Sequence, residues 1–147
     1  MKVLVPIEGS KHSMEGLKVA SHYAQTRNAG IYVMTVTPYV ADVDLELSAS
    51  ERDRLLESMK KRGEDILRKA VDLLKSYGVN YIRTVQSTST STAQEIVNFA
   101  ENEKMDLIVI GSKGMGATAR FFLGSVAAKV VRYSPCNVYV VREPLNG

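Results

Sequence analysis

One stretch decides how the chain folds: Leu107-Ile-Val-Ile-Gly111-Ser-Lys-Gly114-Met-Gly116-Ala-Thr-Ala-Arg-Phe-Phe-Leu-Gly124-Ser125-Val126. Its first four residues are all apolar, which is typical of a strand that is covered on both faces of a sheet. The segment from Ser125 to Tyr133 is predicted to be a helix, and a glycine-rich turn joins it to the strand. A buried strand, a turn and a helix in this order indicate one unit of a parallel α/β fold.

Working outward, the same alternation continues over the whole chain. Further strands are predicted at Lys2–Ile7, Ile31–Val36, Val79–Val85 and Val138–Val141, and further helices at Lys11–Asn28, Ser50–Tyr77 and from Thr92 to about Glu103. Ser10 and Thr92 are predicted N-caps, Gly78 is a predicted C-cap, and the Ser/Thr tract 87–92 is predicted to be a loop. The order β-α-β-α-β-α-β-α-β predicts one doubly wound α/β domain spanning residues 1–147, with a parallel sheet and helices on both faces.

The glycine-rich turn has the chemistry of an anion site. Glycine allows the backbone to approach a ligand closely, and successive N–H groups can form a concavity that holds an anion. Gly124 and Ser125 stand where the last helix begins, where free N–H groups and the helix dipole favour a phosphate. An ordinary turn through Gly111, Gly114 and Gly116 is the alternative interpretation.

Two familiar nucleotide motifs do not account for this turn. The P-loop pattern GxxxxGK[ST] is absent, because Lys113 precedes Gly114 and no lysine follows at the required place. Gly114-x-Gly116-x-x-Ala119 matches a loose dinucleotide fingerprint, but it begins three residues after the glycine that ends its strand. No acidic residue lies about 20 residues further on, so we reject this motif.

Positive charge collects at the same end of the chain. The chain carries a net charge of +3, and the segment from Leu107 to the end carries five basic residues and one acid, a net +4. Such a surplus attracts phosphates of a nucleotide or of nucleic acid, although a solvated basic face is equally compatible with it. No aromatic stacking pattern accompanies the basic residues, which disfavours a nucleic-acid partner.

The sequence lacks the residue patterns of disulfide-stabilised, metal-binding and hydrolytic proteins. The single cysteine, Cys136, allows no internal disulfide and reads as a small buried hydrophobe. The two histidines, His12 and His22, are interpreted as surface helix residues. Because His12 lies near the start of the first helix and close to Glu8, a contact with a bound phosphate is the alternative for this residue. No catalytic triad, metal-ligand spacing or general base for hydrolysis is visible, and no targeting or membrane-spanning segment either. The cytoplasm is the expected compartment.

The spacing of the glycines resembles a known family. Gly111-x-x-Gly114, nine residues and Gly124-Ser125 match the G-2x-G-9x-G-[ST] signature of the ATP-binding branch of the universal stress protein family. The opening Val5-Pro-Ile-Glu-Gly-Ser10 and the ending Ser134-Pro-Cys-Asn-Val-Tyr-Val-Val141 are similar to that family as well. Glu8 departs from the pattern, because the family usually has Asp there, and the extra methylene could shift a ribose contact.

The resemblance implies a fold and a ligand. The fold would be a five-stranded parallel sheet of order 3-2-1-4-5. The ligand would be ATP, or ADP or AMP, with Mg²⁺ or Mn²⁺ held through its phosphates. Pro6, Ile7 and Glu8 would border adenine and ribose, and Val36 would contact adenine through its backbone. The loop residues Gly111, Ser112, Lys113, Gly114, Met115 and Gly116 would approach ribose and phosphates, and Gly124, Ser125 and Val126 would hold the outer phosphates.

By this resemblance the chain is expected to be a cytoplasmic, ATP-binding sensor or regulator of the stress response, without fast catalysis. Its expected partners are the nucleotide, a second copy paired through the strand Val138–Val141, and a protein that the sequence does not identify. Neither nucleic acid nor a membrane is an expected partner. Two alternatives stay open: a slow ATPase or phosphotransferase that uses the same site, and a structural dimer whose site is vestigial.

Overall fold

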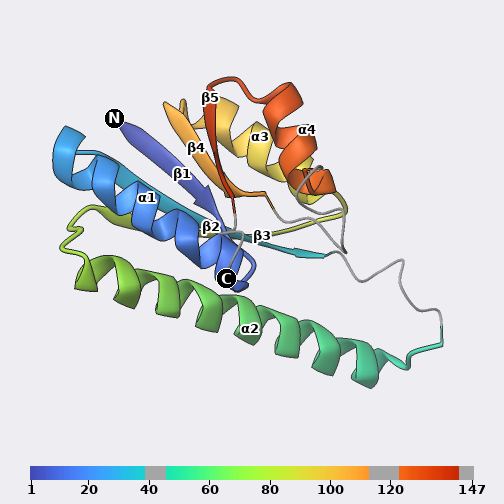
Figure 1. Ribbon diagram of the computed structural model, residues 1–147. Helices are drawn as coiled ribbons and strands as arrows, with labels where there is room; N and C mark the ends of the chain where they lie inside the picture. The colour runs from blue at the N-terminus through green and yellow to red at the C-terminus, as the bar shows by residue number, and fades with distance from the viewer. Residues whose placement is uncertain (39–45, 113–122, 143–147) are drawn as a thin grey trace.

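A computed structural model describes residues 1–38, 46–112 and 123–142 of the chain. In these residues five strands alternate with four helices (Figure 1). The elements are β1 (Lys2–Pro6), α1 (Lys11–Arg27), β2 (Gly30–Pro38), α2 (Ala49–Ser76), β3 (Ile82–Ser89), α3 (Thr92–Asn102), β4 (Leu107–Gly111), α4 (Ser125–Tyr133) and β5 (Asn137–Val141). The predicted alternation of strands and helices is therefore confirmed.

The strands form one parallel sheet in the order β3-β2-β1-β4-β5. β1 lies in the middle, where Val3 pairs with Ile31 of β2 on one side and with Leu107 of β4 on the other. The winding of the chain reverses between β1 and β4. In open α/β sheets, ligands bind outside the carboxyl ends of the strands at such a reversal. The topology that the resemblance implied is confirmed.

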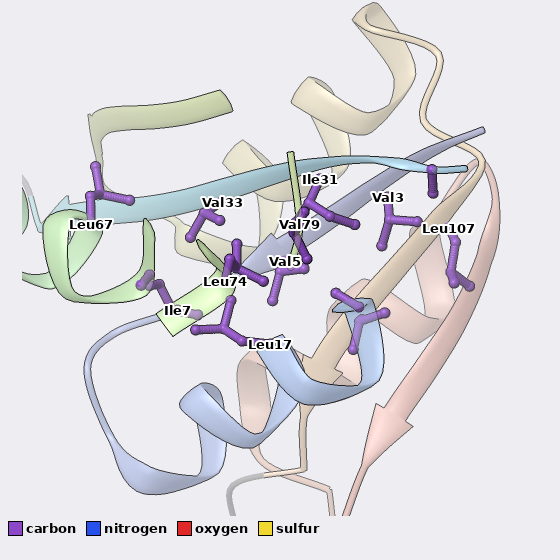
Figure 2. Close-up of a cluster of buried hydrophobic side chains, with 14 residues drawn as sticks. Val3, Val5, Ile7, Leu17, Ile31, Val33, Leu67, Leu74, Val79 and Leu107 are labelled. Carbon is purple, nitrogen blue, oxygen red and sulfur yellow. The ribbon is translucent and has the colours of Figure 1, made fainter. Parts of the chain in front are cut away.

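Helices cover both faces of the sheet and bury two hydrophobic clusters. α1 and α2 lie on one face, and α3 and α4 lie on the other (Figure 1). Figure 2 shows the first cluster, in which Leu17 and Leu74 pack against Val5 of the sheet. Leu4 and Ile108 face the other way, into the second cluster. Consecutive residues of one strand therefore point into opposite hydrophobic clusters. Because both faces of the central strands are buried, these strands are continuous apolar runs in the sequence.

The third strand differs most from the prediction. β3 begins at Ile82 rather than Val79, because Val79 N–H donates to Leu74 O (3.0 Å) as part of the turn that ends α2. β3 also continues to Ser89, into the Ser/Thr tract that we expected to be a loop. The tract finds backbone partners there, since Ser87 pairs with Val36 and Ser89 with Pro38.

The start of the next helix also differs by one residue. The N-cap of α3 is Ser91, whose hydroxyl accepts a hydrogen bond from Gln94 N–H (3.3 Å), so the predicted cap at Thr92 is wrong. Thr92 instead occupies the first turn of the helix. None of the described helices is long and apolar enough to cross a membrane.

Candidate nucleotide site

A cavity of about 850 Å³ opens at the carboxyl ends of the central strands. Residues from the ends of β1, β2 and β4 line it, together with the first turns of α1, α3 and α4 and the middle of α2. Small-molecule sites are typically 300–1,000 Å³ and lie at the point where an open α/β sheet reverses its winding. Both the size and the place of this cavity therefore suit a nucleotide.

Most of the residues singled out from the sequence come together in this cavity. Those that line it are Pro6, Ile7, Glu8, Val36, Gly111, Gly124, Ser125 and Val126. Ser112 is described but is not among the lining residues, and its N–H donates to Val141 O (2.9 Å), which ties the end of β4 to β5. Lys113, Gly114, Met115 and Gly116 lie outside the described residues. The cavity thus brings together the two ends of the glycine-rich segment, the end of β1 and the end of β2.

The turn between β1 and α1 fixes the position of Glu8. Gly9 has φ +93°, a backbone conformation that glycine adopts readily and other residues rarely do. Ser10 is the N-cap of α1, and its hydroxyl also contacts the Glu8 carboxylate as a hydrogen-bond donor. Glu8 N–H in turn faces Ser13 Oγ at 3.4 Å. The longer side chain of glutamate is therefore folded back onto the start of α1, where the helix dipole favours negative charge.

The start of α4 leaves backbone donors toward the cavity. Gly124 is the N-cap, with φ −59° and ψ 156°, and within the described residues no side chain caps the helix. The other three described helices have serine caps, Ser10, Ser48 and Ser91, each of which accepts from a backbone N–H three residues later (3.2–3.3 Å).

The consequence follows from helix geometry. The first intrahelical bond of α4 runs from Ala128 N–H to Gly124 O (2.9 Å). The N–H groups of Ser125, Val126 and Ala127 therefore have no intrahelical partner, and all three residues line the cavity. Such an N-terminus can receive an anion through both its donors and its dipole.

Several lining residues were missed by sequence reasoning. They are Ser13 of α1, Met34, Thr35, Thr37 and Pro38 of β2, Met59, Arg62, Gly63 and Ile66 of α2, Thr92 and Ile96 of α3, Ile110 of β4, and Leu123 and Ala127 at the start of α4. His12, for which the sequence left a surface position and a phosphate contact open, is partly exposed and lines the cavity. The apolar residues of α2 recur at helical spacing in the sequence. This spacing shows that the segment is a helix, but it does not tell which part of the sheet the helix covers. Thr92 and Ile96 lie one helical turn apart. This spacing places them on the same face of α3, and it is the one sequence pattern that could have linked them.

The described basic residues of the segment from Leu107 to the end do not line the cavity, while Lys113 and Arg120 lie outside the described residues. The described ones are Lys129, Arg132 and Arg142. Among the described lining residues, the side chains that can ionise are Glu8, His12 and Arg62. No group of three or more potential metal ligands occurs in the described part of the chain. The described residues thus offer backbone donors and one guanidinium to an anion, and no ready-made metal site.

The comparisons with known proteins agree with this arrangement. Residues 1–142 match the model of the universal stress protein family. A universal stress protein of Methanocaldococcus jannaschii is 37% identical over 147 residues, which cover 97% of this chain and 82% of the relative. The structure of UspA from Lactobacillus plantarum superposes with a TM-score of 0.81 at 25% identity, covering 97% of each chain. A universal stress protein solved in complex with cAMP is 28% identical, with a TM-score of 0.74 over 96% of each chain.

Proposed function

The chain belongs to the universal stress protein family, and from this premise we propose that it binds ATP, or ADP or AMP, as a sensor or regulator of the stress response. The proposed site is the cavity at the sheet reversal, with the described residues Pro6, Ile7, Glu8, Val36, Gly111, Gly124, Ser125 and Val126 as contacts. The loop residues Ser112, Lys113, Gly114, Met115 and Gly116 complete the proposed set. A related protein, 28% identical, has been solved with cAMP, which supports a nucleotide as the ligand.

One observation carries the proposal: α4 begins inside the cavity with three N–H groups that no side chain of the described residues caps. Ser125, Val126 and Ala127 would donate them to the outer phosphates, and the Ser125 hydroxyl would add a donor. Charge-assisted bonds of this kind are about twice as strong as neutral ones. A divalent ion would be held through the phosphate oxygens and water.

The opposite part of the cavity suits a purine and its ribose. Pro6, Val36 and Ile110 contribute apolar surface from three neighbouring strands, and Glu8 offers carboxylate acceptors for ribose hydroxyls. An apolar wall with a few convergent polar groups is the usual composition of a small-molecule site. The ligand would therefore lie with its base over β2 and its phosphates at α4.

The test is whether the protein binds nucleotide in solution. Native mass spectrometry of gently purified protein should show a retained nucleotide. Calorimetric titration with ATP and Mg²⁺ should give a heat of binding, and ATP should raise the melting temperature, because a ligand of the folded state stabilises it. Absence of both effects at millimolar ATP would sink the proposal.

The proposed role is regulatory, with occupancy of the site biasing a surface that a protein partner reads. Slow ATP hydrolysis or phosphate transfer in the same cavity is the rival function, and steady-state release of phosphate separates the two. A structural dimer with a vestigial site would show no nucleotide binding at all. We place the protein in the cytoplasm, where the single Cys136 would remain reduced.

We also propose a homodimer through β5, from Val138 to Val141. β5 is an edge strand of the sheet, and an exposed edge is prone to pair with another chain. Large apolar side chains are exposed beside it: Tyr139 on β5 (43%), and Val131 (45%) and Tyr133 (62%) at the end of α4. Pairing of two β5 strands would cover this surface. Light scattering at micromolar concentration should give the mass of a dimer, and a monomer mass would overturn this part of the proposal.

A further inference from the structure

The middle of α2 forms a wall of the cavity that the glycine signature does not include. Met59, Arg62, Gly63 and Ile66 line the cavity, at spacings of three, four and seven residues from Met59. These spacings place the four residues on one face of a helix. They also mark where α2 turns its face toward the sheet, because residues 53–58 are all exposed and Gly63 is the first buried residue of the helix.

Close packing holds this part of α2 at a fixed distance from the strands. Gly63 is buried, and a Cβ atom there would collide with the side-chain amide of Gln86 on β3. That amide donates to Lys60 O (3.0 Å), one turn before Gly63. On the other side, Ile66 lies so close to Gly9 that a Cβ on Gly9 would stand 3.2 Å from it. The backbone beside Arg62 is therefore anchored at two points, to β3 and to the turn that carries Glu8.

Arg62 lacks the partner that a cation on a helix surface usually has. The residues four before and four after it are Ser58 and Ile66, so no acid stands at that spacing. Asp65, three residues on, forms its ion pair with Arg68 (2.8 Å). Within the described residues no ion pair of Arg62 is recorded, and no other lysine or arginine lines the cavity there. Arg62 thus lines the ligand space, and within the described residues no carboxylate neutralises its charge.

We propose that Arg62 contacts a phosphate of the bound nucleotide and makes the site prefer phosphorylated ligands over nucleosides. This inference rests on the proposed function of the cavity. The backbone donors of α4 supply partial charge only, whereas the guanidinium supplies a full positive charge and up to five N–H donors. The neighbours of Arg62 on α2 lie beside β2 and beside the turn that carries Glu8, since a Cβ on Gly63 would stand 3.5 Å from Thr35 and a Cβ on Gly9 would stand 3.2 Å from Ile66. Arg62 therefore approaches the cavity close to the carboxylate proposed to bind ribose. It would therefore meet the phosphate nearest the ribose, which AMP and ATP share.

The test compares ligands that differ by this phosphate. Adenosine, AMP and ATP are titrated by calorimetry into the full-length wild type and into Arg62→Gln. Because Arg62 is exposed, its charge is partly screened, and we expect AMP and ATP to bind about five- to tenfold more weakly to the variant. Adenosine affinity should change by less than about twofold. The AMP loss should shrink as NaCl is raised, because salt screens an exposed charge. Arg62→Lys keeps the charge and should restore most of the preference.

Arg68→Gln is the matched control, since it makes the same substitution on the same helix away from the cavity, at an arginine paired with Asp65. It should leave all three affinities unchanged, and circular dichroism should show equal folding of all variants. If wild type binds AMP but Arg62→Gln binds it equally well, the inference is wrong and the proposed function stands. Equal losses for AMP and adenosine would overturn it too, since they would indicate contact with the nucleoside. If wild type binds no nucleotide, the proposed function itself fails.

Discussion

Replacing the N-cap of α4 by an acid should move stability and ligand affinity in opposite directions. In Gly124→Asp, the new carboxylate would accept from the first-turn N–H groups, as Ser10, Ser48 and Ser91 do in the other described helices. The backbone at Gly124, with φ −59° and ψ 156°, already has the extended conformation of a capping residue. Aspartate at an N-cap is preferred over glycine by a few tenths of a kcal/mol, and its charge adds about 0.3–1 kcal/mol through the helix dipole. The melting temperature without ligand should therefore stay equal or rise.

ATP should lose affinity in the same variant for two reasons. The carboxylate takes a donor that the phosphate would use, and a lost hydrogen bond to a charged group costs about 1.5–3 kcal/mol. The carboxylate also repels the phosphate by roughly 1–4 kcal/mol at about 4 Å, according to how well water screens the pair. Together these effects predict binding of ATP that is weaker by about sixtyfold or more. Adenosine has no phosphate and should bind as it does to wild type.

The assay combines thermal melts with calorimetric titration of ATP and adenosine. Ser48→Asp is the matched control, because it adds the same charge at the N-cap of α2, and Ser48 itself does not line the cavity. That variant should keep both affinities. Unchanged binding of ATP by Gly124→Asp would refute the placement of phosphate at α4, and so would an equal loss for ATP and adenosine.

Three further predictions test neighbouring features. Ser125→Ala should weaken ATP about tenfold or more by removing one donor to a charged group, with adenosine unaffected in the same titrations. Tyr139→Glu should turn a dimer into a monomer in light scattering, because it places like charges at the proposed β5 contact; a dimer of unchanged mass would contradict that contact. Gly16→Ala should raise the unfolding free energy in urea by about 1 kcal/mol, because its Cβ would lie an ordinary 3.5 Å from Val5 and alanine favours helix, whereas Gly16→Leu should lower it by about 1–3 kcal/mol through overpacking.

The parts of the fold that depend on local chemistry could be predicted from the sequence. Ser10 starts α1 as expected, since a serine cap acts on a backbone N–H only three residues away. α4 has the expected bounds, Ser125–Tyr133. The end of β3 could not be predicted in this way, because Thr88 is flanked by Ser87 and Ser89, and serine does not favour strands over loops. They are in a strand because β2 continues to Pro38 and offers them partners, which is a property of the neighbouring strand.

The candidate site shows the same division. Glu8, Gly111 and Gly124 could be placed near one another from the sequence, since residues after parallel strands gather at one edge of the sheet. The wall formed by α2 could not. In the structure Leu67, Ala70 and Leu74 form the buried face of α2, and Arg62 lies where that face leaves the core and reaches the cavity. That position is set by how far α2 extends along the sheet, which no local pattern encodes.

Glycine at the N-cap of α4 has a different physical reason from glycine at a position with positive φ. Gly9 and Gly78 have φ of +93° and +83°, so their backbone conformation itself favours glycine. Gly124 has φ −59°, which any residue adopts, so conformational freedom does not explain it. α1 and α3 also begin at the cavity, yet Ser10 and Ser91 already occupy one of the first-turn donors of each. α4 alone among the described helices keeps all its first-turn donors for a ligand, because its cap has no side chain to accept them. The feature that glycine supplies at position 124 is therefore the absence of a competing acceptor, and a serine there should weaken phosphate binding even though it fits the backbone.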